Sequence, residues 1–116
     1  MGITQIIAMA IKNGFDPVEA LQDYLEEKDS RVTRAEAAGM VKRFKGQVGA
    51  FIASMKSDQP IPSGTHFEVV EVAWFWTQKT GQASLAKILE TELRKRGARP
   101  IPGEPNEHPG QWTSQI

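Results

Sequence analysis

The chain contains no cysteine among its 116 residues. This absence excludes disulfide bridges, a thiolate nucleophile and any metal site with cysteine ligands. A chain without cysteine also suits a reducing compartment, so we expect a cytoplasmic protein. The first apolar stretch, residues 3–11, lacks a basic leader and a cleavage site, and no apolar run approaches the ~18 residues that a membrane span needs. We therefore expect neither a signal peptide nor a membrane helix.

Histidine is almost as scarce, since the chain has only His66 and His108. Neither has a second histidine at the spacing that a metal site uses, so we expect no metal ion. The sequence also lacks a Gly-x-Ser-x-Gly turn and a glycine-rich phosphate-binding loop. Carboxylate pairs such as Glu68 with Glu71 are typical of solvated helix edges. We therefore predict a non-enzymatic protein without a cofactor. An enzyme would require two acids with perturbed pKa values in one cleft.

Neither sign of charge is in excess, because the chain has 14 basic and 14 acidic residues. A zero net charge argues against a strongly basic nucleic-acid binder. The charges are nevertheless separated along the chain. Residues 1–30 carry six acids and two lysines, whereas residues 31–60 carry six basic residues and two acids. Two interpretations stay open: the two segments are neighbouring helices that neutralise each other, or the basic segment faces an anionic partner.

Apolar residues recur at helical spacing through most of the chain. The longest stretch runs from Ala37 to Met55 in alternating steps of four and three. We predict an all-α fold, a small bundle of about five helices. A single helical domain of residues 1–98 would precede an irregular, proline-rich C-terminal arm of residues 99–116. The expected helices span residues 3–13, 17–28, 34–57, 66–80 and 83–97.

Three of the expected helix starts carry capping signals. Asp16 precedes a proline, which is a favourable pair for a helix start. Thr33 with Glu36 forms a Thr-x-x-Glu capping box, and Thr65 with Glu68 repeats the pattern. The last box favours a helix, although the valines and aromatic residues that follow it also favour a strand.

Three glycines, Gly39, Gly46 and Gly49, interrupt the longest expected helix. Each weakens a helix by roughly 1 kcal/mol relative to alanine. They indicate close packing against another helix or a break near Gly46. A hinge is the functional interpretation.

The segment Phe67–Trp76 is apolar except at its two glutamates. At about 100° per residue, Phe75 falls among the polar residues while the other apolar side chains cover the remaining sides. A chain of this length has little material to enclose a helix that is apolar all round. We therefore predict that a second molecule covers it. The predicted partner-binding residues are Trp74, Phe75, Trp76 and, in the arm, Trp112.

This aromatic surface leads to the first functional hypothesis. The protein would be a non-enzymatic regulatory or protein-interaction protein that forms a homodimer or docks a protein partner. Large aromatic side chains would be the anchors, because they concentrate binding energy at interface centres. The small size and the aromatic helix would also fit a protein of a phage or mobile element.

The alternative hypothesis is a small dimeric DNA-binding regulator that contacts phosphates through basic helix ends. Residues 80–83 or residues 29–31 would form the turn of a helix-turn-helix. The basic side chains of the helix after residues 80–83 gather at its C-terminal end, however, whereas recognition helices read bases near their N-terminus. The candidate nucleic-acid contacts are Lys42, Arg43, Lys45, Lys87, Arg94, Lys95, Arg96 and Arg99.

Overall fold

The computed structural model describes residues 2–28, 30–57, 60–100 and 112–113. These residues form a bundle of five α-helices, which confirms the predicted all-α class. Each helix begins and ends within two residues of its expected bounds. The helices are α1 (Ile3–Asn13), α2 (Pro17–Glu27), α3 (Arg34–Lys56), α4 (Phe67–Lys79) and α5 (Ala83–Lys95).

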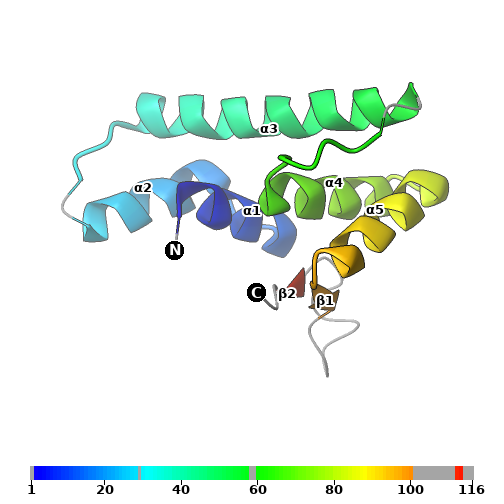
Figure 1. Ribbon diagram of the computed structural model, residues 1–116. Helices are drawn as coiled ribbons and strands as arrows, with labels where there is room; N and C mark the ends of the chain where they lie inside the picture. Colours follow the sequence, from blue (N-terminus) through cyan, green and yellow to red (C-terminus); the bar gives the residue numbers. More distant parts are fainter. Residues whose placement is uncertain (1, 29, 58–59, 101–111, 114–116) are drawn as a thin grey trace.

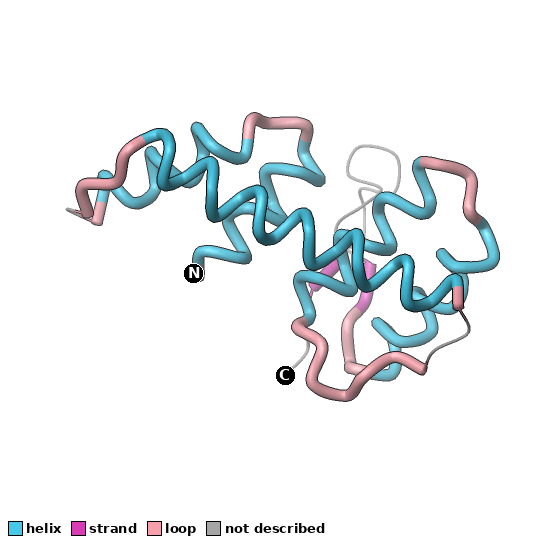
Figure 2. Tube along the Cα trace, turned by 90° about the horizontal axis from the view of Figure 1, so that it is seen from above, coloured by secondary structure: helices cyan, strands magenta, loops and turns pink. Residues whose placement is uncertain are grey.

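The long helix α3 lies across two shorter helix pairs (Figure 1). The pair α1–α2 packs under one half of α3, and α4 of the pair α4–α5 packs under the other half (Figures 1 and 2). The two pairs also touch each other, because α1 contacts α4. α4 is therefore surrounded by α1, α3 and α5.

Local signals explain the end of α1 and the starts of α2 and α3. Gly14 ends α1 with a φ of 77°, a left-handed conformation that glycine adopts without strain. The Asp16 carboxylate accepts a hydrogen bond from the Val18 N–H at 2.9 Å and caps α2. The Thr33 hydroxyl oxygen accepts one from the Glu36 N–H at 3.1 Å and caps α3. Both of these predicted caps are confirmed.

The predicted capping box at Thr65 is wrong. α4 begins one residue later, with His66 in the cap position, and no backbone N–H of its first turn donates a hydrogen bond to the capping side chain. The Thr65 carbonyl oxygen instead accepts a hydrogen bond from the guanidinium of Arg96, beyond the end of α5. A tertiary contact thus holds the start of α4 where the sequence suggested a local one.

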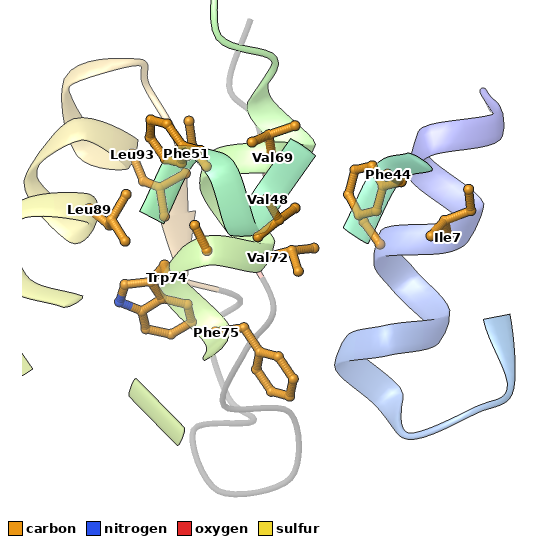
Figure 3. Packing of buried hydrophobic residues seen from close by; sticks show 14 of the residues in the cluster. Ile7, Phe44, Val48, Phe51, Val69, Val72, Trp74, Phe75, Leu89 and Leu93 are labelled. Atoms are coloured by element: carbon orange, nitrogen blue, oxygen red, sulfur yellow. The ribbon is translucent and has the colours of Figure 1, made fainter. Parts of the chain in front are cut away.

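One side of α3 supplies the centre of the core. Its buried residues follow the predicted alternation of four and three, which keeps them on one face of a helix. Figure 3 shows part of the resulting cluster, with Phe44 and Val48 of α3 and Val72 of α4 among the labelled side chains. The buried residues of α3 are Ala37, Val41, Phe44, Val48, Phe51 and Met55.

A buried ion pair joins α1 to α4. The Lys12 ammonium lies 2.8 Å from a Glu71 carboxylate oxygen, and the two side chains are only 8% and 5% exposed. Burial of one charge without the other would carry a large desolvation penalty, so each group depends on its partner. The pair therefore fixes the position of α1 relative to α4.

The predicted C-terminal arm is described only in part. The strand β1 (Arg99–Pro100) pairs in antiparallel orientation with β2 (Trp112–Thr113), a pairing that the sequence did not predict. The other arm residues, and the side chain of Trp112, lie outside the described residues. Within the described ranges, no helix has the length and apolar character that crossing a membrane requires.

The Lys12–Glu71 pair can be tested by single and double substitution. Glu71→Gln leaves the ammonium of Lys12 buried without its counter-charge, and we expect a loss of about 3–5 kcal/mol in the free energy of unfolding. The double variant Lys12→Met/Glu71→Met should recover most of that loss, because both charges are absent. Urea denaturation measures all three proteins. A single variant as stable as the parent, or a double variant less stable than the single one, would show that the pair does not hold the helices together.

Candidate functional site

The aromatic segment of α4 lies inside one molecule. Trp74 and Phe75 are each only 7% exposed, and Trp76 is half-buried. The expectation that a second molecule must cover this helix is therefore wrong. Part of its polar side is also internal, because Glu71 is buried against Lys12, whereas Gln78 and Lys79 are exposed. Three neighbouring helices enclose α4, which the angular pattern of a single helix could not reveal.

The ring of Phe75 also has a local cover. The Lys79 ammonium lies 5.1 Å from the centre of the ring, in a cation–π arrangement. Lys79 itself is exposed, so its hydrocarbon stem shields the ring while its charge stays in water. Trp74 and Phe75 are thus core residues in this structure (Figure 3).

The basic residues at the end of α5 are largely engaged within the protein. Arg94 pairs with Glu90 at 3.1 Å, and Arg96 pairs with Glu92 at 2.9 Å. Arg96 also donates to the Thr65 carbonyl, and its Nη2 atom is buried with no hydrogen-bond partner among the described residues. Arg96 therefore has a structural role, because it connects the end of α5 to the segment before α4.

The helix-turn-helix interpretation is supported mainly by the short connection between α4 and α5. α4 and α5 are joined by residues 80–82, in which Gly81 has a φ of 75°. Of the two lysines exposed on α5, Lys87 lies in the N-terminal half and Lys95 is the last helical residue. The side chain of Arg99 lies outside the described residues. Among the described residues, the exposed side of α5 thus offers few cations that lack an acidic partner.

The outward side of α3 gathers the largest set of free cations in the described part of the chain. Lys42, Arg43, Lys45 and Lys56 are exposed, and none forms an ion pair with another described residue. We call this surface the α3 face. At 100° per residue, Lys42, Lys45 and Lys56 lie within about 60° of one another around the helix, and Arg43 lies about 100° beyond Lys42 on the other flank of the exposed half.

The three glycines of α3 lie on its exposed side and have no packing role in this structure. A Cβ atom built on Gly39, Gly46 or Gly49 would meet nothing within 4 Å. The interpretation of close helix packing is therefore wrong. A break near Gly46 is also wrong, because α3 is continuous from Arg34 to Lys56. The hinge hypothesis is not tested by a single conformation.

The acidic helix α2 does lie beside the basic helix α3, as one interpretation required. Among the described residues, one ion pair joins the two segments: Arg34, the first residue of α3, approaches Asp16, the cap of α2, at 3.5 Å, and both side chains are exposed. The acidic residues of α2 itself point to solvent rather than to the cations of α3. These exposed acids, which we call the α2 face, are Glu19, Asp23, Glu26 and Glu27.

The described residues contain no group of three or more histidine, aspartate or glutamate side chains placed to hold a metal ion. A solvent-open hollow of about 440 Å³ lies beside Lys56 and the start of α5, and its lining contains no acid or histidine. The chemistry that the arrangement shows most clearly is the display of positive charge.

The comparisons with known proteins provide no functional assignment. No family model matches the chain, and no curated protein or solved structure matches it either.

Substitution of Phe75 tests its assignment to the core. Phe75→Ala removes a buried ring, and we expect a loss of about 3–5 kcal/mol in the free energy of unfolding. Phe75→Asp should prevent stable folding, because the charge would be buried without a partner. Circular dichroism during thermal and urea denaturation measures both variants. A Phe75→Asp variant that keeps its stability and changes only its oligomeric state would restore the interface interpretation.

The glycines of α3 give a second test. Gly46→Ala and Gly49→Ala should each stabilise the protein by about 0.5–1 kcal/mol, since both positions are helical, exposed and free of neighbours. Gly14→Ala is the matched control and should destabilise it, because Gly14 has a positive φ. Denaturation midpoints distinguish the two responses. Loss of stability in the α3 variants would indicate that something packs on these positions after all.

Proposed function

We propose that the protein is a non-enzymatic regulator that binds duplex nucleic acid through the α3 face. The supporting observation is the set of four exposed cations, free of described ion pairs, on the outward side of one continuous helix. Phosphate groups are the anions that such a surface attracts, because lysine and arginine displace the counterions of the duplex.

The composition of the α3 face favours a nucleic acid over an acidic protein. Protein interfaces are enriched in aromatic residues and depleted in lysine, whereas nucleic-acid interfaces are polar and strongly positive. The exposed positions of the helix between Lys42 and Lys56 are lysine, arginine, glycine, alanine and glutamine. None of these positions supplies a large apolar anchor for a protein partner.

The length of the α3 face favours a polymer over a single phosphate group. Lys42 and Lys56 are 14 positions apart, a distance of about 21 Å along a helix with a rise of 1.5 Å per residue. One turn of duplex measures about 34 Å. Several phosphates of a duplex can therefore face Lys42, Lys45 and Lys56, which lie within about 60° of one another around the helix, at the same time.

Net neutrality of the chain does not oppose this proposal. The acids that balance the charge of α3 lie largely on the α2 face, which is exposed on another helix. Exposed charges farther apart than about 10 Å are largely screened at 0.1 M salt. A duplex on the α3 face would thus experience mainly the local positive charge. Contacts of this kind position a protein on the backbone without reading bases.

The basic end of α5 is the competing surface for the same ligand. It was the basis of the sequence hypothesis of contacts through helix ends, and Lys87 and Lys95 remain exposed there. The α3 face is the stronger candidate because it carries four free cations, whereas Arg94 and Arg96 of the α5 region already have acidic partners.

Matched double variants distinguish the two surfaces. Lys42→Gln/Lys45→Gln should weaken binding to a random-sequence duplex on the order of tenfold at low salt, because two phosphate contacts are lost. The slope of log affinity against log salt concentration should also become shallower by about 2. The control Lys87→Gln/Lys95→Gln removes the same charge and should leave both quantities unchanged. Fluorescence anisotropy with a labelled duplex measures them.

The outcomes that contradict the proposal are specific. Absence of duplex binding by the parent protein at low salt overturns it. A larger effect of the α5 control than of the α3 variant moves the site to α5. Equal or tighter binding of poly-glutamate than of duplex would identify an acidic protein as the partner.

A further inference from the structure

The α2 face is a second charged surface of this molecule. Its four acids lie on one side of α2, opposite the fully buried Leu21. None of them forms an ion pair with another described residue. The face is therefore open to a partner with the opposite charge.

The α3 face of a second copy has that opposite charge. The α2 face carries four negative charges along one side of its helix, and the α3 face carries four positive charges, of which Lys42, Lys45 and Lys56 share one side of α3. The net charge of the chain is zero, so no overall repulsion keeps two copies apart. We infer that the α2 face of one copy docks on the α3 face of the next.

The geometry makes this contact a head-to-tail one. α2 and α3 pack against each other through their apolar sides, so their charged faces point away from each other. A copy that uses its α2 face leaves its α3 face free for a further copy. Such a heterologous contact extends into a chain unless its rotation closes a ring. A homodimer of identical α3 faces is excluded, because like charges would oppose each other.

The association is weak and depends on ionic strength, because both faces are exposed, lack large apolar anchors and consist mainly of charge. The Debye length is about 30 Å at 0.01 M salt and about 8 Å at 0.15 M. Self-association is therefore favoured at low salt and lost at high salt. It also occupies the surface that we propose for the duplex, so the two contacts exclude each other. The self-association itself does not depend on the proposed function.

Two neutralised variants test the inference without disturbing the core. Glu19→Gln/Asp23→Asn/Glu26→Gln removes three of the four acids of the α2 face, and Lys42→Gln/Arg43→Gln/Lys45→Gln removes three of the four cations of the α3 face. Sedimentation velocity at 20 mM salt should show concentration-dependent association of the parent protein and monomers of either variant. An equimolar mixture of the variants should form a 1:1 complex and nothing larger, because only one complementary pair of faces remains. At 0.5 M salt all samples should be monomeric.

Three results would overturn the inference: a parent protein that is monomeric at 20 mM salt, a variant that associates like the parent, or a mixture that remains two monomers. Circular dichroism verifies that both variants are folded. Duplex binding by the parent without self-association would overturn this inference and leave the proposed function intact. Self-association of the parent without duplex binding would overturn the proposed function and leave this inference intact.

Discussion

The apolar side of α3 is the constraint on which the architecture depends. Its buried residues from Ala37 to Met55 pack against both helix pairs, so one 23-residue helix holds the two halves of the bundle together. The buried pair of Lys12 and Glu71 then fixes α1 against α4, where charge separation in a dry environment would be costly. Because both helix pairs pack on one side of α3, its other side remains exposed and displays charge.

Much of the fold could be predicted because its determinants are local. The alternation of four and three in α3, the glycine after α1 and the caps at Asp16 and Thr33 all act within a few residues of one another. The signal at Thr65 was misleading because the Arg96 guanidinium, distant in sequence, engages its carbonyl. A capping pattern specifies a helix start only where no tertiary contact competes with it.

The sequence predicts which residues of the candidate site are charged, but it does not predict where on the surface they lie. The excess of basic residues in 31–60 is visible in the sequence. Only the structure shows that Arg34 in this range, and Arg96 after α5, have acidic neighbours, whereas the other cations of α3 have none among the described residues. The burial of Phe75 was not predictable from the angular pattern of α4. That pattern describes one helix, whereas burial depends on how many neighbours surround it, and α4 has neighbours on three sides.

The molecule thus combines a neutral total charge with two charged faces of opposite sign on adjacent helices. The location of a bound polyanion decides whether the α3 face has the role that we propose. A titration of isotope-labelled protein with a random-sequence duplex, followed through the backbone amide resonances, measures it directly. We expect the largest shifts between Lys42 and Lys56, with no change in the core of α4. Shifts confined to α5 or to α2, or no shifts at low salt, would contradict the proposed role of α3.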